Sequence, residues 1–421
     1  MKVTPLSLDA LSAAVGRLPD DGLTQSRQAA LAHLRNVGMP NVSEEDWKYT
    51  DLAGIIGIAN DWLKAGASSA PASPPLGEVE TIDADWIVID NGQLRTGDIS
   101  IDGVTVSRFS LSGKDLTPTG RLGGLNVALL HDGLQISIGK GVELSRPIGL
   151  LVVDHASTDP GVSQVRVDIA TGTNSKASII EYHTSSGDAE HFTNSVIDLS
   201  VGDSSQVDYV RVQQRTRNHS HTGHTEVAVG RDARFRHCAF DLGGQLVRND
   251  LVISLAHPGS HSEFNGLYLV GDGQHIDNHT RVDHRVGPAE SHQQYRGILT
   301  GKARGVWNGK AIVHDGADGT DAEQANHNLL LSRQAEIDAK PELEIYADDV
   351  KCSHGTTVGQ LDETALFYLR SRGLSRREAR QLLTHAFAQA IVSLAPLESL
   401  HEFLSDQIAS RLDQLMHEKE S

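Results

Sequence analysis

Apolar residues in the first 66 positions recur every three or four residues. One such series runs from Ala10 to Leu18 and a second from Ala29 to Leu34. This spacing places side chains on one face of a helix, so residues 1–66 are predicted to form an N-terminal helical domain. Residues 67–80 are rich in Ala, Ser and Pro, a composition typical of a linker.

Beyond the linker the apolar period shortens to two. Segments such as DWIVID, LQISI, QVRVDIA and LVISL are short, rich in β-branched residues and bounded by Gly or Asp turns, as strands are. Glycine turns at Gly172, Gly202, Gly230 and Gly301 recur at about 30 residues or a small multiple of that. An antiparallel sandwich and a β-solenoid both remain open. Because aromatic residues make up only 5% of the chain, residues 81–357 favour a solenoid with a narrow aliphatic core.

Helical spacing returns after Asp362. The segment DETALFYLRSRG ends at Gly373, a residue type common just after a helix. Ser375 with Glu378 three residues later predicts a capping box at the next helix start. A further helical pattern follows Pro396, so residues 358–421 are predicted to form a C-terminal helical domain.

The charge and the cysteines exclude several classes of protein. The 421 residues carry a formal charge of −18, which argues against nucleic-acid and anionic-membrane binding. No apolar run reaches the length of a membrane span, and Ser and Asp interrupt the apolar N-terminus. Cys238 and Cys352 lie far apart without a CxxC motif. We therefore expect a cytoplasmic protein with free thiols.

Two glycine–lysine segments resemble phosphate-binding loops only superficially. In GILTGKAR and GVWNGKAI three residues separate the glycines where a P-loop has four, and Ala follows Lys in place of Ser or Thr. Both are predicted to be glycine turns between strands. The chain also lacks the GxSxG elbow of a serine hydrolase.

Two histidine-rich segments carry metal-ligand residue types at strand spacing. NHSHTGHT contains His219, His221 and His224, which we interpret as exposed strand residues. In QHIDNHTRVDH the series His275, Asp277 and His279 alternates with apolar Ile276, which predicts an outward, solvated or partner-facing set. Exposed histidines without a ligand are one interpretation, and a Zn²⁺ or Fe²⁺ site at these residues is the other.

The segment DVKCSHGTTVGQ places Cys352 and His354 two residues apart. If the alternation that begins with Leu343 and Ile345 in the core continues, both side chains point outward together, with Cα atoms about 6.5 Å apart. A bulge at Asp348 and Asp349 would reverse this orientation. Two ligands cannot complete a four-coordinate metal site. We interpret the pair as half a site at an interface. Downstream, the basic run Arg370–Arg380 is either a solvated helix face or a docking surface for an acidic partner.

Long stretches of the chain resemble the SufB/SufD family, subunits of the SufBCD iron–sulfur cluster assembly complex. These stretches are EEDWKYTDL, GDGQHIDNHTRVDH, YRGILTGKARGVWNGKAIV and KPELEIYADDVKCSHGTTVGQLDETALFYLRSRGL. The chain has Cys-Ser-His-Gly-Thr-Thr where SufB typically has His-Glu-Ala-Thr, so the resemblance is to the SufD branch.

The resemblance implies a mainly β protein: a right-handed parallel β-helix flanked by N-terminal and C-terminal helical domains. It implies a non-catalytic scaffold that pairs with SufB through the β-helix and docks the ATPase SufC through its C-terminal helices. His354, with Cys352 beside it, would face SufB and share a nascent iron–sulfur cluster or iron that the isolated chain does not hold tightly. The sequence leaves open whether a homodimer forms when SufB is missing. Flavin has been linked to the family's complex, but the sequence shows no flavin motif.

Two other hypotheses remain open. A metal-dependent hydrolase or lyase would use a groove lined by His275, Asp277 and His279 and would carry a stoichiometric metal. In a purely structural alternative, Cys352 and His354 lie beside an interface made by backbone strands and bind nothing.

Overall fold

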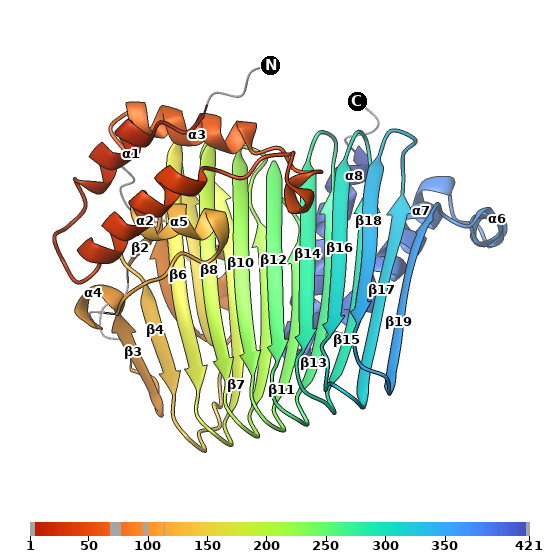
Figure 1. Ribbon diagram of the computed structural model, residues 1–421. Coiled ribbons are helices and arrows are strands. Elements are labelled where there is room, and N and C mark those ends of the chain that lie inside the picture. Colours follow the sequence, from red (N-terminus) through yellow and green to blue (C-terminus); the bar gives the residue numbers. More distant parts are fainter. Residues whose placement is uncertain (1–4, 68–76, 96–99, 113, 418–421) are drawn as a thin grey trace.

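The computed structural model describes residues 5–67, 77–95, 100–112 and 114–417, and these residues build two long sheets (Figure 1). In spatial order, the ten-stranded sheet contains β19 (Val350–Gly359), β17 (Thr320–Leu330), β15 (Glu290–Leu299), β13 (His261–Val270), β11 (Arg234–Asp241), β9 (Gln206–Gln214), β7 (Lys176–Ser186), β5 (Ile148–His155), β1 (Asp85–Asp90) and β2 (Gln93–Leu94). The nine-stranded sheet contains β18 (Glu336–Ile345), β16 (Arg304–Val313), β14 (His275–His284), β12 (Leu246–Leu255), β10 (His219–Val229), β8 (His191–Val201), β6 (Gly161–Thr171), β4 (Leu134–Ile138) and β3 (Val104–Arg108).

The chain alternates between the two sheets at almost every strand. From β4 onward each strand pairs in parallel with the strand two places later, as β17 does with β19 and β16 with β18. Parallel neighbours joined through a second sheet make a parallel β-helix. The solenoid prediction is therefore confirmed and the antiparallel sandwich is excluded. The right-handed winding stays a prediction of the resemblance.

The repeating glycines lie at stacked turns, with one exception. Gly172, Gly202 and Gly230 follow β6, β8 and β10, where the chain leaves the nine-stranded sheet. A Cβ on Gly202 would lie 2.5 Å from the carbonyl oxygen of Thr171, so these turns pack backbone against backbone. Gly301 instead follows β15, where the chain leaves the ten-stranded sheet. Grouping it with the other three glycines was therefore wrong.

Helices from the N-terminal part of the chain cover one end of the nine-stranded sheet (Figure 1). Their apolar side chains pack together and against Val162 and Phe192 at the starts of β6 and β8. The helices are α1 (Leu8–Val15), α2 (Thr24–Val37), η1 (Glu45–Trp47), α3 (Ala53–Lys64), α4 (Phe109–Ser112) and α5 (Gly120–Leu129). Most of the predicted linker 67–80 lies outside the described residues, and its last four positions belong to η2 (Gly77–Thr81).

The C-terminal helices lie on the outer face of the ten-stranded sheet (Figure 1). Leu267, Leu269 and Ile298 on that face pack against Ile391 and Leu404 of the helices. The predicted capping box is present: Ser375 accepts from the Glu378 backbone N–H, and the Glu378 side chain accepts from Ser375 N–H. The helices are α6 (Glu363–Ser371), α7 (Arg376–Val392), η3 (Glu398–Leu400) and α8 (His401–His417).

The two ends of the solenoid differ. At one end the outermost strands are β2 and β3, which pair antiparallel with β1 and β4 and so break the parallel pattern. At the other end β18 and β19 are the last strands, and each has a strand partner on one side only within the described part of the chain. Ile345, Tyr346 and Val358 are exposed there. No helix in the described part is both long and apolar enough to cross a bilayer.

Candidate functional site

Cys352 and His354 lie at the open end, on the interior face of the solenoid wall. In the pairing of β17 with β19, Cys352 lies beside Ala322 and His354 beside Gln324. Ala322 is fully buried and Gln324 is 4% exposed, and paired residues in a parallel ladder point to the same side of the sheet. Cys352 and His354 therefore continue two interior rows of side chains at the coil where the solenoid stops.

This placement corrects the predicted outward orientation. The prediction carried one alternation from Leu343 through to His354. The chain instead leaves β18 at Ile345 and enters β19 at Val350, in the other sheet. The alternation of inward and outward side chains cannot be extended across a turn between sheets. In each strand, either the odd-numbered or the even-numbered residues face the interior, independently of the strand before it. Leu343 packs against the core as predicted, and Cys352 and His354 do share one face.

The pair is accessible because no described coil covers it. His354 is exposed and Cys352 is half-buried. Burial and then the negative charge of Asp321 raise the pKa of the Cys352 thiol, so this thiol is protonated at neutral pH. Proton loss must accompany any binding of a metal ion to its sulfur.

Amide side chains form a polar layer beneath the open end. Thr356 Oγ1 donates to Asn326 Oδ1 at 3.4 Å, and Asn326 Nδ2 donates to the hydroxyl of Tyr268 at 3.2 Å. The Tyr268 hydroxyl in turn donates to Asn328 Oδ1 at 2.5 Å. Sequence analysis missed this layer, although the alternating amides Gln324, Asn326 and Asn328 in β17 were its signal.

The second candidate cluster, on β14, is buried under the N-terminal part of the chain. Asp277 is fully buried and accepts hydrogen bonds from Thr50 Oγ1 at 2.5 Å and Arg248 Nη1 at 2.7 Å. His279 Nε2 lies 3.1 Å from Asp277, and Thr50 Oγ1 lies 2.8 Å from His275 Nε2. These three side chains point away from the core, as predicted. The expectation that they face solvent is wrong, because residues 45–50 cover them.

Electrostatics keep Asp277 ionised in this position. Burial alone would raise the pKa of its carboxyl, but His279 and Arg248 outweigh burial and hold that pKa well below its usual value. Arg248 also donates to the Asp46 carbonyl at 2.8 Å and stacks 4.3 Å from the Trp47 ring centre. The carboxylate therefore serves to anchor the N-terminal segment to the sheet.

The groove expected by the hydrolase hypothesis has a different lining. A cavity of about 400 Å³ lies between residues 45–47 and the outer face of the nine-stranded sheet, and His224, Asp250 and His279 are among its lining residues. His275 and Asp277 are not. Within the described residues, no group of three or more His, Cys, Asp or Glu side chains is arranged to hold a metal ion.

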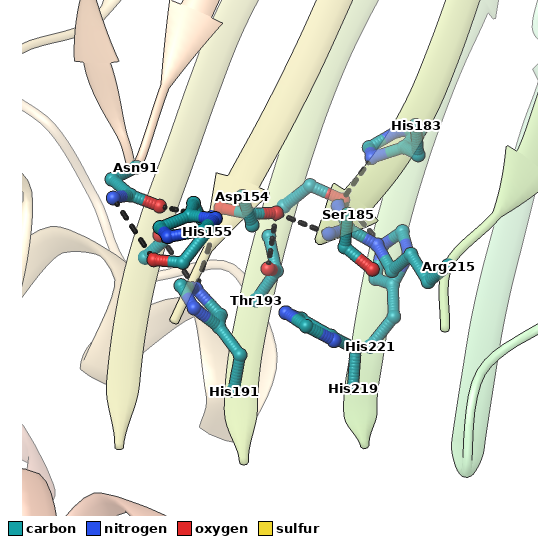
Figure 2. A network of polar contacts seen from close by, with 12 residues as sticks. Asn91, Asp154, His155, His183, Ser185, His191, Thr193, Arg215, His219 and His221 are labelled. Atoms are coloured by element: carbon teal, nitrogen blue, oxygen red, sulfur yellow. Dashed lines mark hydrogen bonds and ion pairs between the residues drawn. The ribbon is translucent and has the colours of Figure 1, made fainter. Parts of the chain in front are cut away.

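Two histidines of the first segment, His219 and His221, face the interior, which corrects their predicted exposure, whereas His224 lies on the outer face. His219 and His221 are fully buried, at the edge of the polar network shown in Figure 2. At its centre the buried Asp154 forms an ion pair with Arg215, accepts from Thr193 Oγ1 at 2.8 Å and lies 3.3 Å from His191.

Burial in this network lowers the pKa values of His183, His219 and His221. Burial, followed by the charge of His191, lowers the pKa of His219 to about 3. Burial alone would raise the pKa of Glu181, but His183, Arg211 and Tyr209 together outweigh burial and lower that pKa to about 2. Ion pairs and hydrogen bonds hold these groups to one another inside the solenoid, so their role is structural.

Comparison with known proteins identifies the family of the chain. The family model described as the SufBD core domain of the SUF system for FeS cluster assembly matches residues 153–387. Iron–sulfur cluster assembly protein SufD of Escherichia coli is 30% identical over 414 residues, which cover 93% of this chain and 94% of that protein. An iron–sulfur cluster assembly SufBD family protein of Synechocystis is 30% identical, with 95% and 93% covered. One of Mycobacterium leprae is 26% identical, with 89% and 91% covered.

The chain belongs to the SufB/SufD family. The matched SufBD core domain runs from β5 into α7, so it contains both candidate clusters and the open end of the solenoid. The segment around Trp47 and Thr50, which covers Asp277, lies outside the matched residues. The family resemblance seen in the sequence is confirmed, and it assigns the chain to iron–sulfur cluster assembly.

Proposed function

We propose that the chain is a non-catalytic scaffold subunit that pairs with SufB through the open end of its solenoid. The observation that carries the proposal is the pair of uncovered strands β18 and β19 beside Cys352 and His354. Unpaired strand edges offer backbone N–H and C=O groups to a second chain. The exposed Ile345, Tyr346 and Val358 add apolar area at the same end.

In this proposal His354 and Cys352 contribute part of a ligand set to a nascent iron–sulfur cluster or iron. SufB contributes the remaining ligands, because two ligands leave a tetrahedral site incomplete. The cluster is cargo held between subunits, so the isolated chain does not keep it. The amides Asn326 and Asn328 below the open end support this role, since hydrogen bonds around a cluster tune its stability.

The C-terminal helices are proposed to dock the ATPase SufC. α6 projects beyond β19 in Figure 1, and on it Phe367 and Tyr368 are 72% and 56% exposed. The Arg372 guanidinium lies 5.1 Å from the Tyr368 ring centre. Exposed aromatic and arginine side chains are the residue types that dominate binding energy at protein interfaces.

Replacement of His354 tests the site. We expect His354→Ala, co-expressed with SufB and SufC, to assemble into the complex normally but to lower the cluster yield at least about tenfold, since a ligand is removed without loss of buried contacts. Anaerobic absorption spectroscopy and iron and sulfide analysis measure the yield. Size-exclusion chromatography measures assembly.

His292→Ala is the matched control, because His292 is 41% exposed and lies on the outer face of the same sheet. This control should keep the wild-type yield. An intact His354→Ala complex that builds clusters at the wild-type rate would overturn the site assignment. Loss of assembly in that variant would show that His354 stabilises the interface rather than a cluster.

A further inference from the structure

Strand β18, at the open end of the solenoid (Figure 1), presents a row of mostly acidic side chains. Ile337 and Leu343 pack against apolar clusters of the core, so the odd-numbered residues of this strand face the interior and the even-numbered residues face outward. The side chains of Asp338 and Glu344 are 35% and 38% exposed. The outward row consists of Glu336, Asp338, Lys340, Glu342 and Glu344.

The strand behind this row supplies cations to two of its carboxylates. Arg304 Nη2 lies 3.1 Å from Asp338 Oδ2, and Lys310 Nζ lies 2.5 Å from Glu344 Oε1. Both cations belong to β16, the neighbour of β18 on its covered side. Because an ionised carboxylate accepts several hydrogen bonds, these ion pairs leave the side of each carboxylate that faces the open end available to a further donor.

Lys340, the cation within the row, already has two carboxylate partners. Its Nζ lies 2.8 Å from Glu45 of η1 and 3.3 Å from Glu342 in the same row. Glu336 is exposed and lies beside Arg304 in the ladder of β16 with β18. The charges that a strand added to β18 would meet first are therefore predominantly negative.

Neighbouring strands within this chain place opposite charges side by side. On the outer face of the ten-stranded sheet, Arg236 lies between Asp208 of β9 and Glu263 of β13 in the ladder. Arg236 donates two hydrogen bonds of 2.6 Å to the Asp208 carboxylate. Opposite charges across a strand pair stabilise it, whereas like charges destabilise it. The same rule requires Lys or Arg in a strand that pairs with β18.

The backbone of β18 sets a second condition. The N–H groups of Glu336 and Tyr346, at the two ends of the strand, donate to carbonyls on the β16 side at 2.9 and 2.8 Å. Because backbone groups along a strand alternate in direction, the odd-numbered residues direct theirs toward the free edge, where Pro341 has no N–H to donate. Proline is confined to such edge positions in sheets. A partner strand therefore finds the hydrogen-bonding edge of β18 interrupted near its middle.

Strand β19, the other free edge, has neither feature. Its ten residues, VKCSHGTTVG, include no carboxylate and no proline. Its backbone therefore offers hydrogen bonds to a partner along the whole strand. Of the two edges, it is β18 that restricts which strand can be added.

We propose that the β18 edge selects its partner by charge: it pairs with a strand that presents Lys or Arg at alternate, outward-facing positions, and it disfavours a second copy of this chain. The inference rests on the proposed pairing through the open end and adds the chemistry that the partner must carry. Two copies that meet with β18 against β18 would oppose carboxylate to carboxylate and bring two interrupted edges together. Like charges opposed in this way are a means by which interfaces reject wrong partners.

Neutralising the row tests the proposal. At low ionic strength, we expect the neutralised variant to bind purified SufB at least about tenfold more weakly than the wild type does, and we expect high salt to reduce this difference because it screens exposed charges. Sedimentation velocity of the free chain should show stronger self-association for the neutralised variant than for the wild type. The variant carries four substitutions that nearly preserve side-chain shape: Glu336→Gln, Asp338→Asn, Glu342→Gln and Glu344→Gln.

The matched control removes the same number of exposed carboxylates away from the open end, with Asp61→Asn, Asp83→Asn, Glu143→Gln and Glu190→Gln. This control should bind SufB and self-associate like the wild type. If the neutralised variant equals the wild type in SufB affinity or in self-association, selection by charge is overturned and the pairing itself stands. If the wild type and SufB do not associate at all, the proposed pairing is wrong and this inference falls with it.

Discussion

Several buried histidines have pKa values far below that of a free imidazole. Burial lowers the pKa of His219 and of His237 to about 3 and that of His284 to about 4, from an ordinary value of 6.5. The folded chain keeps these rings neutral where the unfolded chain would protonate them. Below pH 6.5 the unfolded state therefore binds more protons, and the free energy of unfolding falls as the pH falls.

We expect the thermal unfolding midpoint to drop between pH 7 and pH 5. The histidines dominate that window because the pKa of Glu181 is about 2 in the folded chain, and the stability that its ionised carboxylate provides is lost only as the pH falls from 4.5 toward 2. Each such histidine removes about 1.4 kcal/mol per pH unit below 6.5. His237→Gln should reduce this pH dependence, as measured by calorimetry at both pH values.

His257→Gln serves as the comparison, because His257 is exposed and should leave the pH dependence unchanged. If His237→Gln and the wild type lose the same stability between pH 7 and pH 5, the buried ring is not the group that takes up the proton.

At the residue scale, alternation in the sequence shows which side chains share a face but not which face is interior. Cys352 and His354 share a face as predicted, yet a turn at residues 346–349 moved them to the other sheet and reversed the expected orientation. His219 and His221 look like surface residues by type. One nitrogen of each ring nevertheless finds a hydroxyl partner inside the solenoid, Thr216 for His219 and Ser195 for His221. Ser195 lies 26 positions before His221, in the preceding coil of the same sheet, so this partner is brought close only by the stacking of coils.

Among the elements, the short N-terminal segment around η1 is held by one arginine. Arg248 is 2% exposed, forms ion pairs with Asp250 and Asp277 at 2.8 and 2.7 Å, and stacks on Trp47. Its removal would leave the Asp277 carboxylate buried with less positive charge nearby. Breaking a buried pair in this way costs far more than breaking an exposed one.

We expect Arg248→Ala to destabilise the chain by about 3–5 kcal/mol and to increase hydrogen exchange in residues 45–52 first. Denaturant unfolding and exchange mass spectrometry give the two measurements. Arg236→Ala removes a half-exposed pair with Asp208 and should cost no more than about 1 kcal/mol. Equal costs for the two variants would contradict the anchoring role of Arg248.

Helix α7 was predictable because its sequence carries a capping box and an apolar stripe, whereas α5 carries neither and was not predictable. The capping box at Ser375 and the apolar stripe of α7 give its start and its buried face from sequence alone. α5 has the sequence GRLGGLNVAL, in which three glycines disfavour a helix. Its apolar residues Leu125 and Leu129 instead pack into the cluster that holds Leu34 of α2, so tertiary contacts override its weak propensity.

For the whole molecule, the difference between its two ends determines where a partner can add strands. We expect Ile345→Lys to weaken association with SufB by at least about tenfold, equivalent to about 1.4 kcal/mol, because it places a charge on the exposed apolar end of β18. Its monomer stability should change little, since Ile345 is already 43% exposed. Pull-down with purified SufB and a thermal melt of the free chain provide the two readouts.

Val286→Lys adds the same charge at a 36% exposed position in a turn and should bind SufB normally. Unchanged affinity in Ile345→Lys would indicate that SufB meets another surface of the chain.

At this scale the repeat of glycine turns and the low aromatic content were enough to predict a solenoid. The open end was not predictable from those features, because it depends on which strands find no neighbour.

The asymmetry of the ends also has a consequence for synthesis on the ribosome. The end with β1 to β4 and the N-terminal helices is made first and can begin to stack coils while later residues are still being added. In a stack where each coil contacts only its neighbours, every new coil folds onto a finished template. The uncovered edges of β18 and β19 emerge almost last, so the most aggregation-prone surface of the solenoid is exposed for the shortest time before a partner arrives.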